Sequence, residues 1–511
     1  MMKIIEYFCN KVYFLKFLIH VYKNFRVKKT KDSKNITLVE FNTHKPAIIG
    51  ILYLIKNLQK NQNSKVIFFY PGIALDYKRF VKRLINLIIF NFQQTLTFLS
   101  IGASIKILTN FKSRNDKNVE KIFKETVSNF KDKKDLSVLK LENILVGDLF
   151  YDTYTRWNAK PTVDFKSEEF KNELYKYFKE FYKWLDIFEN EKISSVVVTH
   201  PVYNLALPLR IAQKFGIPAY IGSINFLQYF DKDRKHLWDN KYRNSFSTLN
   251  NDEKNKALEF SKKKLEIKFN PNEISENDSQ NSIIQRDVYW GRLNTFSPIR
   301  RRDIFKKNGK KNIVVLAHCF YDAPHNEGDW LFPDFYEWID HLFKISVQTD
   351  YNWYIKKHPA SVQQKLNDQT IDEFVEKYPN IEVLENVNNS ELLADKVDLI
   401  LTAWGSAGYE FSYHNVPVIL ASNNCSYSGY NFTFKPKNIE EFNYAIKNFQ
   451  LINFNFDKED IYKFYYNQIL THWDLYPNYQ KYVNGLSSNL SKDDKIYKNW
   501  CKDFEEEKHL K

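Results

Sequence analysis

The chain has 511 residues, which is enough for roughly two or three domains that each bury a hydrophobic core. Hydrophobic residues make up 43% of it and aromatic residues 17%, which excludes a disordered chain, and the low counts of 13 glycines and 15 prolines exclude a fibrous one. The net charge of +14 fits a uniform compositional drift, or attraction to anionic substrates or to an anionic membrane surface. Zinc-finger spacing and long basic blocks are missing, so nucleic-acid binding is not expected.

The N-terminal segment predicts a basic, imperfectly amphipathic helix. Lys16, His20 and Lys23 recur at helical spacing, and apolar residues such as Leu15 and Tyr22 lie on the opposite face. The charges interrupt the apolar residues too often for a signal peptide or a spanning helix. We therefore expect a cytoplasmic protein whose first helix packs on a domain or lies on the inner face of the membrane. The four cysteines are far apart and form no CxxC, so neither disulfides nor structural zinc are expected.

The first half alternates short β-branched runs with longer amphipathic stretches, which is the βαβ pattern of a parallel sheet. The predicted strands are 36–41, 65–70, 104–108, 195–199 and 219–222, and the predicted helices include 47–58, 166–189 and 204–215.

A polar stretch at 270–285 and a basic run at 300–311 then predict a domain boundary. Residues 1–300 would form an N-terminal α/β domain on the acceptor side, residues 301–450 a Rossmann-like domain that binds a nucleotide sugar, and residues 451–511 a helical tail that packs back on the domains. The strands predicted after the boundary are 312–317, 353–357, 381–384, 399–402 and 416–420, and the helices are 334–343, 361–377, 390–394, 407–414 and 439–449.

Four histidines follow predicted strands directly or within a few residues: His44, His200, His318 and His358. In open α/β sheets, ligands bind at the carboxyl ends of the strands. With two of these histidines on each side of the boundary, we expect them to converge on one cleft between two facing domains.

The segment Lys356, Lys357, His358 and Pro359 is the sharpest of these strand ends. Two cations and an imidazole lie next to the start of a helix, and Pro359 occupies the position at which proline favours a helix start. Cations beside a helix N-terminus favour a phosphate site, and a basic surface turn is the alternative interpretation.

A second strand end, in LILTAWGSAGYEF, also suggests a ligand. Gly405 allows close approach of the backbone, Ser406 can cap the helix or donate to a phosphate oxygen, and Glu410 lies one turn later within reach of ribose hydroxyls. The segment is neither a Walker A loop nor a GxGxxG motif, and tight packing alone is the alternative.

Two loops add polar residues. The loop AHCFYDAPHNEGDW contains His318, Asp322 and His325, which suit sugar hydroxyls or interdomain contacts, and their spacing matches no established metal-ligand motif. Ser428 lies in a loop after the strand VPVIL, where it would touch the base or the sugar, or belong to a plain surface loop. Metal ions and other cofactors are not expected.

Asp148, Asp152 and Arg156 in VGDLFYDTYTRW are spaced four residues apart, so on a helix they share one face. They would form an ion-pair ladder, or they would contribute to acceptor binding or catalysis.

The segments HCFYDAPHNEGDWLFPDFYEW, IKKHP and LTAWGSAGYEFSYHNVPVILASNNCSYSGYNF resemble the capsule polysaccharide biosynthesis protein family, which is related to the bacterial Kdo transferases. GDLFYDTYTR and VVVTHPVYN also look like segments of this group. The similarity covers roughly residues 310–440 firmly and 140–225 in patches. It implies a GT-B architecture, with the donor nucleotide held by the C-terminal domain and no essential metal.

The His-Pro motif also resembles that of bacterial sialyltransferases and of polyol-phosphate transferases that use cytidine nucleotides. By this similarity, His358 and Ser406 would contact the donor phosphate, Glu410 the ribose, and the donor would be a CMP-activated ulosonic acid such as Kdo. Trp404 and Ala407 depart from the serines and threonines that relatives carry around the glycine.

The expected function is therefore transfer of a sugar from a nucleotide-sugar donor to a glycan or glycolipid acceptor of a surface polysaccharide. Lys356, Lys357 and His358 would stabilise the leaving phosphate, and the candidate bases are, in order, Asp148, Asp152, His200 and His44. A CDP-polyol phosphotransferase, a sugar-nucleotide epimerase and a non-catalytic scaffold of a polysaccharide assembly complex are the alternatives.

Overall fold

The structure is a computed structural model. It describes residues 2–27, 34–42, 48, 51–52, 54–56, 58–59, 63–74, 76–109, 116–222, 227–270, 296, 299–328, 330–358, 363–422 and 426–470. The chain divides into two compact units. Of the described residues, the first unit contains 2–150 and Phe165–Arg234, and the second contains Tyr151–Asp164 and 235–470.

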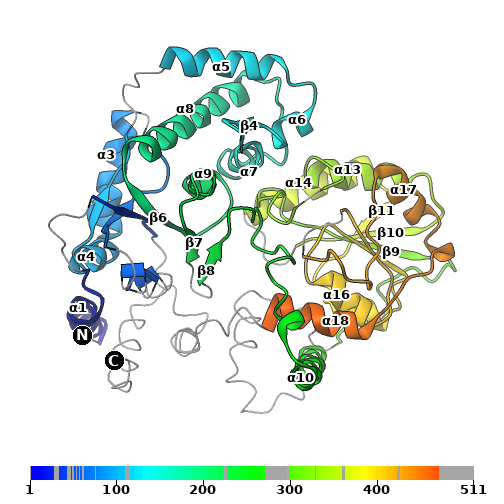
Figure 1. The fold of residues 1–511 in the computed structure, drawn as a ribbon. Coiled ribbons are helices and arrows are strands. Elements are labelled where there is room, and N and C mark those ends of the chain that lie inside the picture. Colours follow the sequence, from blue (N-terminus) through cyan, green and yellow to red (C-terminus); the bar gives the residue numbers. More distant parts are fainter. Residues whose placement is uncertain are drawn as a thin grey trace. The chain divides into compact units, whose positions relative to one another are not determined.

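The first unit is built on a six-stranded sheet in the order β3-β2-β1-β6-β7-β8 (Figure 1). Its strands are parallel except β8, which runs antiparallel to β7. The bounds are β1 (Ile36–Glu40), β2 (Lys65–Phe69), β3 (Ser104–Lys106), β6 (Ile193–Val198), β7 (Ala219–Gly222) and β8 (Leu227–Phe230). The order of the strands reverses between β1 and β6, and such a switch point is where ligands bind in sheets of this kind.

Helices cover both faces of this sheet. On one face, Phe17 of α1 (Met2–Phe25) and Phe98 of α4 (Phe92–Ser100) join Phe68 of β2 in one core. On the other, Trp184 of α8 (Glu168–Asn190) packs edge-on against Phe69, with ring centroids 5.0 Å apart. The remaining elements are α3 (Tyr77–Ile85), the π-helix η1 (Asn86–Phe90), α5 (Asp116–Ser128), α6 (Lys133–Ser137), the hairpin of β4 (Lys140–Leu141) and β5 (Ile144–Leu145), η2 (Asn204–Ala206) and α9 (Leu207–Lys214). The helix α7 (Gly147–Trp157) contains the boundary between the units.

The second unit has a five-stranded, wholly parallel sheet in the order β11-β10-β9-β12-β13. Its strands are β9 (Asn312–Leu316), β10 (Asn352–Lys356), β11 (Ile381–Val383), β12 (Leu399–Thr402) and β13 (Val418–Leu420). Nearly every strand residue is buried, as expected for a parallel sheet covered on both faces. The switch point of this unit lies between β9 and β12.

The residues of each strand alternate between two cores. Ile313 and Val315 face a core shared with α13 (Phe335–Ser346), α14 (Gln364–Lys377) and α17 (Ile439–Lys447), whereas Val314 faces a core shared with α15 (Asn389–Ala394), α16 (Ala407–Tyr413) and α18 (Lys458–Tyr465). Figure 1 shows these helices on opposite faces of the sheet. The predicted α/β class with two Rossmann-like units is therefore confirmed.

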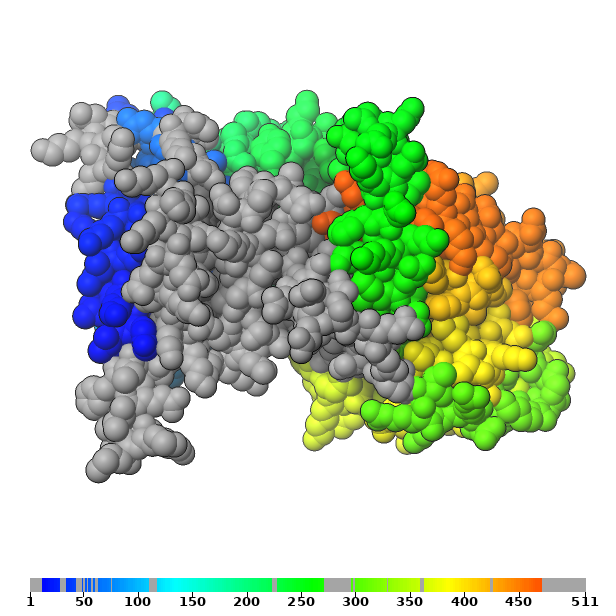
Figure 2. Space-filling model, turned by 90° about the horizontal axis from the view of Figure 1, so that it is seen from below, coloured from blue at the N-terminus to red at the C-terminus, as the bar shows by residue number. Residues whose placement is uncertain are grey.

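The division of the chain differs from the expected boundary at residue 300. The helix α10 (Asn251–Phe269) belongs to the second unit, because Leu265 is fully buried in the core beneath α16 and α18. Figure 2 shows α10, in green, packed against α18, in orange. The short elements η3 (Ser245–Thr248), η6 (Phe449–Leu451) and the π-helix η7 (Tyr466–Leu470) complete this unit, and residues 471–511 of the expected helical tail lie outside the described residues.

The N-terminal helix forms as predicted, but its buried face differs from the expected one. Phe14, Phe17 and Val21 are buried, while Leu15 and Tyr22, which were assigned to the packed face, are 58% and 47% exposed. Among the described helices, none combines the length and the apolarity that crossing a bilayer requires.

Candidate functional site

His318 and Gly405 meet at the switch point of the second unit. His318 follows β9, and Gly405 follows β12, its neighbour in the sheet. The His318 Nε2–H donates to the Trp404 carbonyl oxygen at 2.7 Å. Gly405 has a φ of +106°, which side-chain-bearing residues rarely adopt, and a Cβ there would lie 3.5 Å from the His318 ring. The backbone after β12 therefore passes directly over an imidazole.

The His318 ring is held in a neutral state. Burial, reinforced by the nearby His358, lowers its pKa to about 3, and the hydrogen bond to Trp404 offsets this only in part. The ring stacks on Phe335 with an interplanar angle of 6° and lies 6.0 Å from the His358 ring. The structure thus brings together His318 and His358, the two histidines predicted for this domain. The His318 imidazole is uncharged and takes part in a hydrogen bond.

Lys356 begins a buried polar network beneath this surface. Its Nζ donates to Asn389 Oδ1 at 2.8 Å, and Asn389 Nδ2 donates to Glu410 Oε2 at 3.2 Å. Burial lowers the pKa of Lys356 to about 8, although Glu410 and Glu391 act in the opposite direction. The lysine therefore carries a charge that an anionic ligand would stabilise further.

Glu410 lies inside the unit, which bears on its predicted contact with ribose. Its side chain is 0% exposed, and its Oε1 lies 3.0 Å from Nζ of Lys268, which is itself 2% exposed. The Glu410 carboxylate is therefore bound by Lys268 and Asn389 inside the unit. In this position it holds α10, α15 and α16 together beneath the site.

One predicted phosphate contact and one predicted helix cap differ from their expected geometry. Lys357 Nζ contacts Asp372 at 2.8 Å and Glu385 at 3.3 Å, so it points to carboxylates. Burial acts to lower the pKa of Lys357, but these two carboxylates outweigh it and raise it. Ser406 precedes α16 without a capping hydrogen bond from its side chain, so the predicted cap is absent. Pro359 lies outside the described residues.

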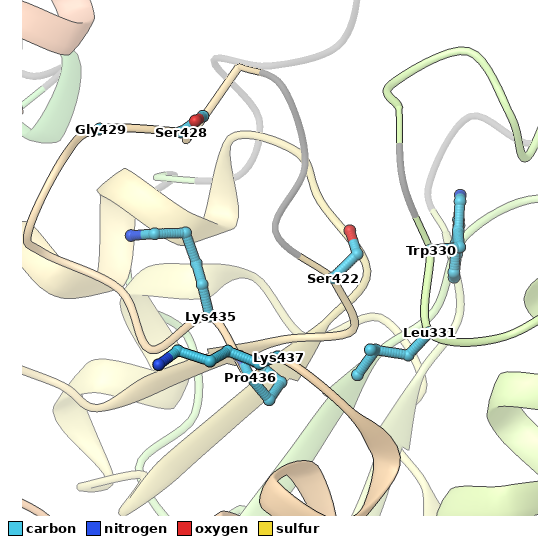
Figure 3. A pocket seen from close by; sticks show the side chains of 8 residues that line it. All are labelled: Trp330, Leu331, Ser422, Ser428, Gly429, Lys435, Pro436 and Lys437. Carbon is cyan, nitrogen blue, oxygen red and sulfur yellow. The ribbon is translucent and has the colours of Figure 1, made fainter.

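A pocket of about 520 Å³ opens beside the switch point (Figure 3). In Figure 3 its wall runs from Trp330 and Leu331 past Ser422 to Ser428 and Gly429, with Lys435, Pro436 and Lys437 completing the lining. Ser422 is 1% exposed, and its hydroxyl has no hydrogen-bond partner among the described residues. A buried hydroxyl without a partner is costly, so a polar group bound in this pocket would stabilise Ser422.

Aromatic rings connect the pocket to the switch point. The Trp330 ring lies 4.9 Å from the Trp404 ring, which lies 5.2 Å from His318. Trp330 Nε1–H donates to the Pro324 carbonyl oxygen, which fixes the indole against the loop after β9. Ser428, for which a contact with the base or the sugar or a plain surface loop was expected, lines this pocket, and its carbonyl oxygen accepts from Asn240 Nδ2 at 2.6 Å.

The same loop after β9 forms a histidine–aspartate pair. His325 Nδ1 lies 2.6 Å from Asp152 Oδ1, and the His325 backbone N–H donates to Asp152 Oδ2 at 3.4 Å. Asp152 is 2% exposed, and Tyr151 packs edge-on against the imidazole. A carboxylate that holds one ring nitrogen orients the imidazole, as in sites where a histidine acts as general base.

The three residues spaced along α7 therefore do not form an ion-pair ladder. Arg156 Nη1 lies 3.5 Å from Asp322 Oδ1. Asp148, in the first unit, forms a buried ion pair with Arg210 at 2.8 Å. Its carboxylate is therefore occupied by a guanidinium inside the first unit.

The first unit carries its own polar cluster at its switch point. Glu40 ends β1 and accepts from the Thr199 backbone N–H at 2.7 Å and from the Thr199 hydroxyl at 2.8 Å. The same hydroxyl lies 2.9 Å from Nδ1 of His200, an exposed residue. While Glu40 is ionised, the Thr199 oxygen can only accept from His200 Nδ1, so the exposed imidazole presents Nε2 as its acceptor.

Sequence reasoning missed Glu40, Lys268, Trp330, Ser422 and Lys435. Glu40 had a usable signal, because a carboxylate at the end of the apolar strand ITLVE must be satisfied inside the fold. The others come from loops and from α10, where burial depends on tertiary packing. His44, the remaining candidate, lies outside the described residues.

Replacing Gly408 by alanine is expected to lower the free energy of unfolding of the second unit by about 1–3 kcal/mol. A Cβ there would lie 2.6 Å from the Tyr427 hydroxyl oxygen, and Tyr427, which is 2% exposed, donates to the Gly405 carbonyl oxygen. Hydrogen exchange of β12 and β13 amides measures the loss. Unchanged protection would show that the Tyr427 ring moves aside at no cost.

Comparisons with known proteins give neither a matching family model nor a matching curated sequence. Solved structures that match include KpsC of Thermosulfurimonas dismutans, described as a beta Kdo 2,4 transferase, at 12% identity over 55% of this chain and 85% of that one, with a TM-score of 0.32. The UDP-GlcNAc 2-epimerase of Neisseria meningitidis matches at 11% identity over 92% of this chain and 100% of that one, with a TM-score of 0.20. The wall teichoic acid polymerase TagF matches at 12% identity over 97% and 98%, with a TM-score of 0.23. Because the three scores are low, these likenesses carry no argument about the site.

Proposed function

We propose that the chain is a glycosyltransferase of the GT-B type that moves a sugar from a nucleotide-activated donor to a growing surface polysaccharide. The favoured donor is a CMP-activated ulosonic acid such as Kdo. The proposal rests on the resemblance of the 310–440 segment and on the arrangement of the second unit's switch point.

The observation that carries the proposal is the junction of His318 with the backbone at Gly405. A glycine with positive φ at the carboxyl edge of a parallel sheet allows a phosphate or ribose to approach the backbone. The adjoining pocket offers the Trp330 indole for stacking, the Ser422 hydroxyl for a polar group and Lys435 for a negative charge. Burial lowers the pKa of Lys435 to about 8, while Asp460 acts in the opposite direction. A nucleotide that carries an acidic sugar matches this set of groups.

In sugar transfer, the acceptor hydroxyl oxygen bonds to the anomeric carbon while the bond to the donor phosphate breaks. The proton of that hydroxyl must go to a base. The geometry favours His325, held by Asp152, for this role over Asp148, whose carboxylate is paired with Arg210. His200 in the first unit is the alternative acceptor.

The test is the thermal stability of the purified chain with CMP, CDP, UDP or GDP, with and without EDTA. A ligand present at about 100 times its dissociation constant stabilises the folded state by roughly 2.7 kcal/mol. We expect a CMP-selective shift that survives EDTA and is lost in His358→Ala and Ser422→Ala. His341→Ala serves as the matched control, because His341 lies on α13 and bonds Asn443 at 2.6 Å instead of lining the site.

The other outcomes separate the alternatives. A CDP-selective shift would favour the polyol phosphotransferase, and a UDP shift followed by conversion of a UDP-sugar without acceptor would favour the epimerase. A chain that no nucleotide stabilises would be a scaffold, and the proposal would fail.

A further inference from the structure

A run of large apolar side chains in the first unit is exposed between α3 and α4. Exposed fractions are 40% for Leu84, 43% for Ile85, 56% for Ile88, 64% for Ile89, 74% for Phe90 and 50% for Phe92. Single exposed apolar residues are normal on a protein surface, but a contiguous run indicates a surface that contacts something apolar. We call these six residues the 84–92 patch.

The polar residues of the same segment point inward. Asn91, Gln94 and Thr97 are 8%, 5% and 0% exposed, respectively. Asn91 Nδ2 donates to Asn86 Oδ1 at 2.8 Å, and Asn86 Nδ2 in turn donates to the Tyr70 hydroxyl at 2.6 Å. Amides therefore hold the segment to the unit, and its apolar side chains face outward. This is the reverse of the pattern that an amphipathic segment adopts towards water.

The π-helix η1 produces this arrangement. Its wider turn brings Asn91 N–H to the Asn86 carbonyl oxygen at 2.9 Å, and the Thr95 hydroxyl bonds the Leu87 carbonyl oxygen at 2.9 Å. Leu87 alone among the apolar residues of η1 is buried. π-Helical turns are rare and are frequently found at functional sites.

The charge beside the patch is mainly positive. The preceding helix α3 carries Lys78 and Lys82 towards solvent, and Arg79 pairs with the N-cap residue Asp76 at 3.3 Å. The sequence contains no further aspartate or glutamate before Asp116. Exposed apolar residues next to lysine and arginine are the signature of an interfacial segment on an anionic bilayer, where each cation near the surface adds about 1 kcal/mol. A second copy of the chain fits less well, because a symmetric contact would bring the two sets of cations together.

We propose that the 84–92 patch is a membrane-binding site that inserts Ile88, Ile89 and Phe90 into the interface of a bilayer containing anionic lipid. This places the contact on α3, η1 and α4 rather than on the N-terminal helix alone. The inference does not depend on the proposed function, since it concerns the first unit and a different ligand.

Co-sedimentation with vesicles tests the proposal. The probes are vesicles of phosphatidylcholine alone and of phosphatidylcholine mixed with phosphatidylglycerol. We expect the full chain to bind the mixed vesicles and the combined variant Ile88→Ser, Ile89→Ser and Phe90→Ser to bind at least about tenfold more weakly. The pair Lys78→Gln and Lys82→Gln should weaken binding to mixed vesicles and make the remaining binding less sensitive to salt.

A matched control makes the same kind of change elsewhere. Val347, Tyr444 and Leu451 of the second unit are 63%, 59% and 78% exposed, so replacing all three by serine removes a similar apolar surface. This control should bind vesicles like the unmodified chain. Equal binding by the 84–92 variant, or no binding by the unmodified chain, would overturn the proposal.

Light scattering after size-exclusion chromatography tests the alternative explanation, which is that the 84–92 patch mediates self-association of the chain. A dimer that the 84–92 variant converts to a monomer, without vesicle binding, would assign the patch to self-association and overturn the membrane proposal. Nucleotide-dependent stabilisation is measured on the same variants. If the unmodified chain binds mixed vesicles but no nucleotide stabilises it, the proposed function fails and the membrane site stands.

Discussion

Replacing Lys268 by methionine is expected to lower the free energy of unfolding of the second unit by about 3–5 kcal/mol. Lys268 and Glu410 are 2% and 0% exposed, and their charged atoms lie 3.0 Å apart. Methionine keeps the length of the side chain but leaves the Glu410 carboxylate buried without its cation. Because α10 supplies Lys268 and α16 supplies Glu410, the loss should appear as faster hydrogen exchange in both helices.

The double variant Lys268→Met with Glu410→Gln measures how much of this loss comes from the stranded charge. We expect it to be more stable than Lys268→Met alone, because the neutral amide retains a partner in Asn389. Lys256→Met is the matched control on α10: its pair with Asp252 is 74% and 76% exposed, so the change should cost less than about 0.5 kcal/mol. Equal losses for Lys256→Met and Lys268→Met would contradict the assigned role of the buried pair.

The sequence predicted the sheets well because parallel strands are buried on both faces. Runs such as ISSVVV and LILT are short and rich in β-branched or apolar residues, and the predicted strands formed within two residues of their expected ends. The antiparallel strand β8 was missed, since its sequence LQYF lacks that signature. The boundary between the units was also expected at a different residue. The hydrophobic pattern of α10 does not indicate against which of the two sheets the helix packs.

The candidate site was predictable at the level of strand ends but not of individual contacts. His318, His358 and Gly405 follow strands β9, β10 and β12, so topology alone brings them to one edge. Whether a lysine or a glutamate at that edge faces a ligand depends on neighbours distant in sequence. Lys357 contacts carboxylates of α14 and of the segment after β11, and Glu410 contacts Lys268 of α10. The periodicity of the sequence indicates neither pairing.

The pairing of Asp152 with His325 shows the same limit. Both residues were candidates, one as a base and the other as part of a loop, but they are separated by 173 positions. The sequence likewise did not indicate that Glu40, the buried glutamate at the switch point of the first unit, accepts hydrogen bonds from Thr199.

Replacing Glu40 by glutamine is expected to stabilise the first unit at alkaline pH and to have little effect at acidic pH. Burial raises the pKa of Glu40 from 4.5 to about 7, against the lowering effect of its hydrogen bonds from Thr199. A folded-state pKa above the unfolded value means that the fold prefers the protonated acid. The penalty is therefore absent below about pH 4.5, grows as the pH rises, and is complete above about pH 7, where it amounts to roughly 3 kcal/mol.

Glutamine removes this penalty because its amide is neutral at every pH, and its carbonyl oxygen and NH₂ can pair with the Thr199 N–H and hydroxyl. Hydrogen exchange of β1 and β6 amides, measured across this pH range, reports the stability of the first unit by itself. Glu180, whose pKa burial also raises to about 7, remains in the variant, so the pH dependence should shrink without vanishing. Glu191→Gln, at an exposed position just after α8, should leave the profile unchanged. If Glu40→Gln instead destabilises the unit most at alkaline pH, the ionised carboxylate is the form that the fold prefers, and the hydrogen bonds from Thr199 outweigh burial.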